Sequence, residues 1–283
     1  MKVVHTIAEL RAQLEPVRGE SSVGLVPTMG ALHAGHVSLF TAARRECDCV
    51  VASVFVNPAQ FSPQEDFARY PRDERRDEQV AAEAGVDFLF VPATDELYPR
   101  GYQTWVDIER LSQTLEGEQR PGHFRGVATI CLKLFNIVRP QLAYFGQKDA
   151  QQALVLRRMV ADLDLDVELR VLPTVRDADG LALSSRNAYL SPAERKLALT
   201  LPRALETRDR ERARKLLADA GVETDYVDVL EDDGIRVLAG AIRVGSTRLI
   251  DNVPLGLHAT AAEPPPRGRK PGRLRRPSEG GSE

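Results

Sequence analysis

Short apolar runs alternate with longer segments of helical spacing over the first two-thirds of the chain. Continuous apolar runs predict buried strands at 23–26, 49–56, 88–91, 142–145 and 167–172. Apolar residues three and four apart predict helices at 35–45, 72–84, 127–138 and 150–163. Because the strands are apolar throughout and helices separate them, the pattern predicts a parallel sheet covered by helices on both faces.

The pattern changes near Ser191. Ser191 is a good N-cap, Pro192 suits the first helical turn, and Glu194 stands where a capping box requires it. A charged helical face follows at 208–212. Further strands are predicted at 226–230 and 241–250. We therefore expect an α/β fold in which a parallel-sheet domain spans 1–187 and a smaller α+β domain spans 188–258.

The last 25 residues, 259–283, differ from both predicted domains. They contain five prolines, six basic residues and three acidic residues, with almost no large apolar side chains. Such a segment cannot bury enough surface to offset its ordering entropy, so we expect a disordered tail. A weak contact of 267–276 with nucleic acid or an anionic surface is an open alternative.

Composition narrows the class of protein. The 283 residues are 43% hydrophobic and 28% charged, which is ordinary for a globular chain, and the net charge of −3 argues against a dedicated nucleic-acid binder. No apolar run approaches the roughly 18 residues of a membrane span, and no signal-peptide pattern opens the sequence. Three cysteines cannot all pair, so reduced thiols are expected. These features predict a cytoplasmic protein without a membrane or nucleic-acid partner.

Two histidines stand at a predicted strand-to-helix turn, in the run PTMGALHAGH from Pro27 to His36. The first turn of a helix exposes unpaired N–H groups and the positive end of the helix dipole, which favour phosphate. Gly30 and Gly35 allow close approach of the backbone, and His33 and His36 can donate to the same anion. Two unrelated histidines, or a zinc site without a convincing third ligand, are the alternatives. We expect a nucleotide phosphate site.

A second candidate site follows the predicted strand 142–145, in the run FGQKD. Ligands of open α/β sheets bind at the carboxyl ends of strands. Lys148 can place a positive charge on a phosphate, and Asp149 can accept hydrogen bonds from ribose hydroxyls. An ordinary helix start, with Asp149 as the cap and Lys148 in solvent, is the alternative that the local sequence favours.

Polar side chains gather again between Asp179 and Asn187, where 184–186 reads Ser-Ser-Arg. Hydroxyl donors and a guanidinium suit a polyphosphate, and no base is visible for a serine nucleophile, so we expect binding and not covalent chemistry. A surface loop is the alternative. Gln60 and Gln152 are neutral amides that can bind a hydroxyl or carboxylate oxygen, although glutamines usually lie on the surface.

Taken together and in this order, these segments resemble the pantoate–β-alanine ligase (pantothenate synthetase) family. The motif H-x-G-H alone is shared by a wide group of nucleotidyltransferases. Its combination with N-P-x-Q-F at 57–61, G-x-K-D-x-Q-Q at 146–152 and S-S-R-N at 184–187 is far more specific. The similarity also includes 70–72, 120–126, 173–190 and 247–252.

The resemblance implies a Rossmann-like domain that carries the active site, and a smaller domain that closes over it. It further implies a cytoplasmic homodimer that uses Mg²⁺ and acts as a ligase of pantothenate biosynthesis. Pantoate and ATP would first form pantoyl adenylate and pyrophosphate. β-Alanine would then attack the activated acyl carbon, giving pantothenate and AMP. Positioning and charge neutralisation dominate catalysis of such a phosphoryl attack.

The resemblance also implies roles for individual residues. His36, His33 and Lys148 would be catalytic, with His36 as the proton donor that assists departure of pyrophosphate. Gln60 and Gln152 would bind pantoate, and Gln60 would also lie near β-alanine. The expected ATP contacts are Met29, Gly30, Ala31, Leu32, His33, Ala34, Gly35, His36, Gly146, Gln147, Lys148, Asp149, Val175, Leu183, Ser184, Ser185 and Arg186.

Some positions depart from the family pattern. Asp77 matches a position associated with Mg²⁺, but Arg75 and Arg76 stand where relatives often carry acidic residues, which weakens that assignment. Ala150 replaces an aromatic residue, from which we expect changed packing and retained binding. Between about 201 and 226 the chain is shorter than its relatives, so the second domain is expected to fold but could close less well.

Two alternatives to an active ligase therefore stay open. One is another H-x-G-H nucleotidyltransferase that makes a dinucleotide cofactor, against which Gln60, Gln152 and the Ser-Ser-Arg-Asn context argue. The other is a nucleotide-binding protein whose turnover is impaired by the shortened second domain.

Overall fold

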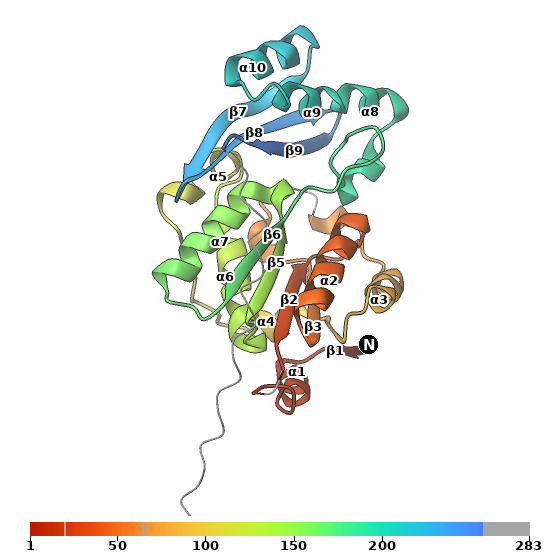
Figure 1. The fold of residues 1–283 in the computed structure, drawn as a ribbon, viewed down its shortest axis with the longest axis vertical. Helices are drawn as coiled ribbons and strands as arrows, with labels where there is room; N and C mark the ends of the chain where they lie inside the picture. Colours follow the sequence, from red (N-terminus) through yellow and green to blue (C-terminus); the bar gives the residue numbers. More distant parts are fainter. Residues whose placement is uncertain (20, 64, 66, 257–283) are drawn as a thin grey trace, which may run out of the picture.

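The chain forms two sheets in a computed structural model that describes residues 1–256 except 20, 64 and 66. The first sheet has six parallel strands and the second has three antiparallel strands. Figure 1 shows them one above the other along the long axis of the molecule. This confirms the predicted α/β class with a smaller α+β part. The predicted tail 259–283 lies outside the described residues.

The six-stranded sheet has the order β1-β4-β3-β2-β5-β6. The strands are β1 (Lys2–Val4), β2 (Val23–Thr28), β3 (Cys49–Val54), β4 (Phe88–Phe90), β5 (Leu142–Gly146) and β6 (Glu168–Leu172). The five strands predicted from apolar runs are present, whereas the three-residue edge strand β1 was not predicted. After β2, the next strands along the chain, β3 and β4, lie on one side of it. The later strands β5 and β6 lie on the other side. The carboxyl ends of β2 and β5 are therefore the place where a ligand is expected.

Helices cover both faces of this sheet (Figure 1). On one face α2 (Ala34–Glu46) and α3 (Glu74–Glu83) enclose a core around Phe40 and Leu89. On the other face α1 (Ile7–Leu14), α6 (His123–Val138) and α7 (Ala150–Asp162) enclose a larger core around Leu25 and Phe135. Two single-turn helices, α4 (Thr94–Leu97) and α5 (Glu116–Gln119), lie in the connections. The predicted helix 72–84 starts at Glu74 because the Asp73 carboxylate caps it, accepting from Arg76 N at 3.1 Å.

The second sheet contains β7 (Glu223–Asp232), β8 (Ile235–Val244) and β9 (Thr247–Pro254), with β8 in the middle. The single strand predicted at 241–250 is wrong, because this run crosses the β8–β9 hairpin. Apolar residues flank the turn on both sides, while Gly245 takes a positive φ of 59° that reverses the chain. The capping box at Ser191 is confirmed by its two hydrogen bonds with Glu194.

The region expected to be shortened still builds a core. It forms α9 (Thr200–Leu205) and α10 (Arg210–Asp219), which follow α8 (Pro192–Ala198) and pack against the second sheet. Leu201, Leu205 and Leu217 are buried there with apolar side chains of β7 and β8. Ala150 and Leu154 of α7 form a small apolar cluster with Leu230 of β7, so the helices of the first sheet also pack against the second sheet. The second sheet is therefore folded and seated on the first.

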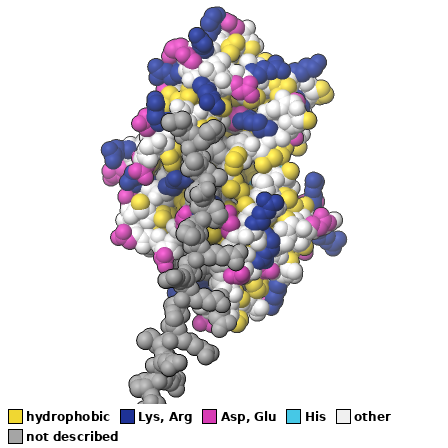
Figure 2. Space-filling model, viewed as in Figure 1, with side chains coloured by type: hydrophobic (Ala, Val, Ile, Leu, Met, Phe, Trp, Pro, Cys, Tyr) yellow, Lys and Arg dark blue, Asp and Glu magenta, His cyan; other side chains and the backbone are white. Residues whose placement is uncertain are grey.

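The length of the helices and the charges on the surface bear on possible partners. Among the residues that the structure describes, every helix is too short or too polar to cross a bilayer. On the face seen in Figure 2, Lys and Arg side chains are interspersed with Asp and Glu. An anionic ligand on this face would therefore depend on particular side chains and not on a general positive field.

Candidate active site

A cavity of about 230 Å³ lies at the carboxyl ends of β2 and β5, where the sheet topology predicts a ligand. A second cavity of about 470 Å³ adjoins it and shares Arg120, Lys148, Asp149, Ser184 and Arg186 with it. The predicted site residues that line the first cavity are Met29, His33, Gly35, His36, Gln60, Gly146, Lys148, Asp149, Gln152, Val175, Leu183, Ser184, Ser185 and Arg186. The predicted contacts that line neither cavity are Gly30, Ala31, Leu32, Ala34 and Gln147.

The two histidines form the start of α2. His33 is the N-cap, and its Nδ1 accepts from Gly35 N at 3.1 Å. His36 Nδ1 accepts from His33 N at 3.3 Å, and the two ring centroids lie 4.2 Å apart. Because each Nδ1 is an acceptor, a neutral ring carries its proton on Nε2. Each histidine can therefore offer an Nε2–H donor to an anion in the cavity.

Burial keeps these rings neutral. Burial lowers the pKa of His36 to about 3, helped by the charges of His33 and Lys148. The pKa of His33 is also lowered, first by burial and then by Lys148. Lys148 lines the same cavity as both rings. Three cationic or hydrogen-bond donating groups thus converge on one space.

Asp77 holds the turn that leads into these histidines. Its Oδ2 accepts from Ala31 N at 2.9 Å and its Oδ1 accepts from Leu32 N at 2.7 Å. Gly30 takes a φ of 83°, and a Cβ there would lie only 2.7 Å from Asp77 Oδ2. Asp77 is buried, and burial raises the pKa of its carboxyl despite these backbone hydrogen bonds. Its two oxygens are therefore committed to the backbone of the turn.

The sequence raised two metal sites, a Mg²⁺ contact at Asp77 and a zinc alternative at the two histidines. The described part of the chain contains no group of three or more His, Cys, Asp or Glu side chains placed to hold a metal ion. A zinc site at His33 and His36 thus lacks further ligands among these residues. Each carboxylate oxygen of Asp77 accepts one backbone hydrogen bond and keeps a second lone pair, so its role as a Mg²⁺ contact stays a prediction.

Gln60 lines the same cavity and ends the 3-10 turn Pro58–Gln60. Its side-chain Oε1 accepts from Asn57 Nδ2 at 3.0 Å, and its Nε2 lies 3.0 Å from Met29 Sδ. Its backbone carbonyl lies 2.9 Å from His123 Nδ1 and accepts from Arg120 Nη2 at 3.3 Å. Burial lowers the pKa of His123 to about 4, aided by Arg120. Gln60 is therefore a buried amide held in one orientation.

The segment 184–186 approaches the cavity from the connection after β6. Ser184 Oγ accepts from Arg186 N at 3.3 Å, which starts the 3-10 turn Ser185–Tyr189. The Ser185 and Tyr70 hydroxyls lie 3.4 Å apart. Leu183 N donates to Val175 O at 2.9 Å, so these two predicted nucleotide contacts are adjacent. The segment lines the cavity and is not a free surface loop.

Lys148 and Asp149 lie in the turn between β5 and α7. Lys148 Nζ is 3.6 Å from Asp149 Oδ1, and Lys148 is largely buried with a side-chain exposure of 21%. Asp149 makes no side-chain capping hydrogen bond to α7. The simple helix-cap alternative is therefore not what the structure shows, and both side chains line the cavity.

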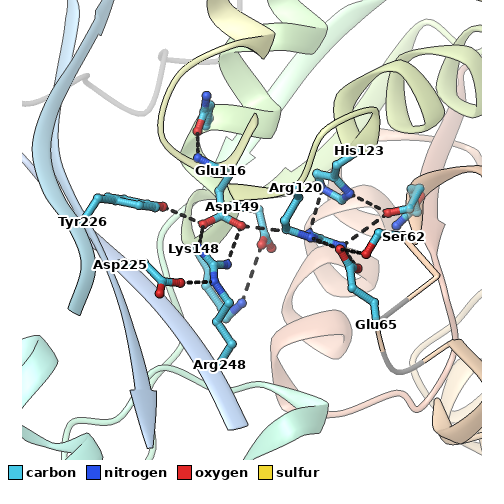
Figure 3. A network of polar contacts seen from close by, with 12 residues as sticks. Ser62, Glu65, Glu116, Arg120, His123, Lys148, Asp149, Asp225, Tyr226 and Arg248 are labelled. Atoms are coloured by element: carbon cyan, nitrogen blue, oxygen red, sulfur yellow. Dashed lines mark hydrogen bonds and ion pairs between the residues drawn. The ribbon is translucent and has the colours of Figure 1, made fainter. Parts of the chain in front are cut away.

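A network of charged side chains joins the two sheets beside this turn (Figure 3). Glu116 is buried and accepts from both terminal nitrogens of Arg248, at 2.6 and 2.8 Å, and from the Tyr226 hydroxyl at 2.7 Å. Burial alone would raise the pKa of Glu116, but Arg248 and Tyr226 hold it below its ordinary value. Arg248 Nε also donates to Asp225 Oδ2 at 2.5 Å. Glu116 therefore fastens β9 to the first sheet.

Sequence patterns missed several residues that shape this site. Asn57, Arg120 and His123 lie inside segments that carry the family similarity. Each is a polar residue next to a glycine or proline, and this pattern could have indicated their role. Glu116 gave no such signal. Asn252 lies in the segment 247–252 that shares the family similarity, but no role was assigned to it. The partners of both residues are more than 100 residues away in the chain.

The chain is similar to known proteins over most of its length. A profile of the Pantoate-beta-alanine ligase family matches residues 2–254. Pantothenate synthetase of Pelotomaculum thermopropionicum is 50% identical, with 90% of this chain and 99% of the relative covered. That alignment runs over 280 positions, and 90% of 283 residues is about 255, so about 25 positions fall opposite gaps in this chain.

Solved structures show the same similarity. The crystal structure of pantothenate synthetase from Thermus thermophilus matches with a TM-score of 0.85 and 47% identity, covering 90% of this chain and 99% of the other. A pantoate-beta-alanine ligase from Francisella tularensis, solved with beta-gamma ATP and beta-alanine, matches with a TM-score of 0.82 and 34% identity. It covers 90% of this chain and 98% of that one.

Proposed function

The chain belongs to the pantoate-beta-alanine ligase family, which joins pantoate to β-alanine with ATP, and we propose that it does so through a pantoyl adenylate formed in the cavity between His36 and Lys148. The observation that carries this proposal is the convergence of both histidines, Lys148 and Gln60 on one cavity of about 230 Å³. Three of these groups suit a polyphosphate and one suits an uncharged or carboxylate oxygen.

In the first step, a carboxylate oxygen of pantoate attacks the α-phosphorus of ATP. The new O–P bond forms as the bond to the bridging oxygen breaks, and pyrophosphate leaves with that electron pair. Negative charge grows on the leaving group, so preorganised donors there lower the barrier. Lys148, the Nε2–H groups of His33 and His36, and the N-terminal turn of α2 supply such donors.

His36 acts in this proposal as a neutral hydrogen-bond donor. The lowered pKa of about 3 leaves it uncharged near pH 7, so it has no extra proton to give before ATP binds. A bound polyphosphate favours the charged ring, and this raises the pKa and strengthens the Nε2–H donor as charge develops. Full proton transfer from His36, the role suggested by the family resemblance, stays a prediction.

Pantoate is proposed to lie against the amides of Gln60 and Gln152. Both line the cavity, and Asn57 with Met29 fixes the orientation of the Gln60 amide. Neutral amides can bind hydroxyl and carboxylate oxygens without reducing the nucleophilicity of the carboxylate as a fixed positive charge would. In the second step the β-alanine amine attacks the acyl carbon of the adenylate, and AMP leaves.

The remaining expectations concern the ion, the assembly and the compartment. Mg²⁺ is proposed from the family resemblance alone, Asp77 is proposed to anchor the turn at 30–32, and no step of the proposed reaction is assigned to the ion. A homodimer and a cytoplasmic location are proposed from the family resemblance. Light scattering during size-exclusion chromatography tests the dimer, and a mass of one 31.3 kDa chain would contradict it.

The experiment that tests the adenylate is ATP–pyrophosphate exchange with purified protein. Exchange that needs pantoate, and proceeds without β-alanine, is the expected result. Exchange that needs a phosphorylated cofactor precursor would support another nucleotidyltransferase. Tight ATP binding without any exchange would support impaired turnover, the alternative that the approximately 25 absent positions favour.

A further inference from the structure

Strand β9 contacts the two loops that carry the proposed nucleotide contacts. Asp251 accepts from Arg176 Nη1 at 2.6 Å and Nη2 at 3.0 Å, next to Val175 in the loop after β6. Asn252 contacts the turn at 147–149, after β5. Since β5 and β6 are neighbours, adjacent residues of β9 reach the ends of two adjacent strands of the other sheet.

The Asn252 side chain uses both of its donors and its acceptor oxygen on the turn that carries Lys148. Its Nδ2 donates to Gln147 O at 2.8 Å and to Lys148 O at 2.9 Å. Its Oδ1 accepts from Gln147 Nε2 at 2.8 Å. Asn252 is buried, with 3% of its surface exposed. The backbone carbonyl of Lys148 is thus held by a residue that lies 104 positions later in the chain.

Only an amide fits this arrangement. Two carbonyl oxygens need two donors from one side chain, and the Gln147 amide needs an acceptor beside them. A carboxylate would face the two carbonyls with acceptors only, and an aliphatic side chain would remove both hydrogen bonds to them. The chemistry of the site therefore specifies asparagine at 252.

A second attachment keeps β9 in place. Arg248 lies four residues before Asn252 on the same strand and forms the buried pair with Glu116 seen in Figure 3, which also shows Lys148 and Asp149 beside that pair. Residues four apart share one face of a strand. Arg248 and Asn252 therefore fasten the same face of β9 to two separate segments of the first sheet.

We propose that Asn252 is a positioning residue that holds Lys148 in the place where it meets the ATP polyphosphate. The inference rests on the proposed role of Lys148. The second sheet then contributes to nucleotide binding without touching the nucleotide, because its correct seating sets the backbone from which Lys148 extends.

A double-mutant cycle in ATP affinity tests this proposal. Asn252→Leu keeps the number and branching of the side-chain heavy atoms, removes every side-chain hydrogen bond and adds no charge. Calorimetric titration with ATP would be done for the wild type, Asn252→Leu, Lys148→Ala and the double variant. Asn136→Leu is the matched control, since Asn136 is exposed on α6.

If Asn252 acts through Lys148, Asn252→Leu weakens ATP binding about tenfold with Lys148 present and less than about twofold in Lys148→Ala. The same factor in both backgrounds, or no change in either, would overturn the positioning role. Unchanged ATP affinity in Lys148→Ala alone would instead overturn the proposed role of Lys148. Thermal unfolding of each protein checks folding, and Asn252→Ser enters the same cycle if the leucine variant does not fold.

Discussion

The two sides of the candidate active site are held in place by different parts of the chain. The histidine side depends on Asp77, which lies on α3, one of the helices that cover the first sheet. Asp77 binds the turn before His33. The lysine side depends on Asn252, which comes from β9 of the other sheet. The histidine side is therefore held by residues of the first sheet and its helices, whereas the lysine side also depends on contacts from the second sheet.

This difference shows which side of the site would be affected if the expected shortening at about 201–226 weakened the seating of the second sheet. A poorly seated second sheet would leave the α2 start and its donors unchanged. It would release the turn at 147–149 and the loop at 174–176, which both bind β9. The buried pair of Glu116 with Arg248, together with the apolar contact at Ala150, shows that the sheet is seated in this chain. We expect an active enzyme.

The largest effect is expected from His36→Ala on the histidine side. Loss of one preorganised donor to the developing charge should reduce pantoate-dependent exchange about 100- to 1000-fold. The fold should survive, because His33 remains as the N-cap of α2. His5→Ala, at an exposed position, is the matched control. Exchange within tenfold of the wild type would refute the proposed role of His36.

Glu116→Gln tests the seating of the second sheet. Breaking one partner of a buried ion pair should lower the free energy of unfolding by about 2–4 kcal/mol near pH 7. Because the pKa of Glu116 is lowered in the fold, its contribution is present above its ordinary pKa and is lost as pH falls through the folded value. Denaturant unfolding at several pH values measures both effects.

Glu118→Gln is the control for that experiment, since Glu118 is exposed on the same short helix. If Glu116→Gln and Glu118→Gln lower the free energy of unfolding equally, the pair with Arg248 does not hold the sheets together.

The variant Asp77→Asn distinguishes two roles of Asp77, as an anchor of the turn at 30–32 or as a ligand of Mg²⁺. Loss of the charged acceptor for the Ala31 and Leu32 amides should cost about 1–3 kcal/mol of folding free energy and lower exchange about tenfold. Excess Mg²⁺ should not restore the exchange rate. Asp73→Asn is the control, because asparagine caps a helix as well as aspartate does. Recovery of Asp77→Asn at high Mg²⁺ would favour the metal role instead.

The smallest effect concerns His123 beside Gln60. Burial lowers its pKa to about 4 in the fold, against an ordinary 6.5. Between these values the unfolded chain binds more protons, so stability rises with pH and is lost on acidification. From pH 7 to 5 the free energy of unfolding should fall by about 1–2 kcal/mol more in the wild type than in His123→Gln. Equal slopes of the free energy of unfolding against pH in the wild type and in His123→Gln would mean that His123 titrates alike in the folded and unfolded states.

Sequence patterns predicted local features well and distant contacts poorly. The apolar runs identified β2 to β6, and the capping box identified the start of α8, because both signals lie within a few residues. The run at 241–250 was misassigned because apolar residues continue on both sides of a turn. The histidine segment and the Lys148 segment share one cavity because β2 and β5 are neighbours in the sheet. Helical and strand periodicity do not reveal which strands are neighbours.

The contacts that hold the site were beyond prediction from local patterns. Asp77 lies 45 positions from Leu32, and Asn252 lies 104 positions from Lys148. Nothing in either side chain's neighbourhood in the sequence distinguishes a buried anchor from a solvated polar residue. Only the folded arrangement shows that each one holds a different side of the same cavity.

Pantothenate formation by the purified protein is the most direct test of the central claim that this chain carries a complete and active site. Pantoate, β-alanine, ATP and Mg²⁺ would be incubated with the wild type, and pantothenate and AMP quantified together. Equal amounts of both products, absent when pantoate is omitted, are the predicted result. Neither product at any enzyme concentration, or AMP without pantothenate, would contradict the claim.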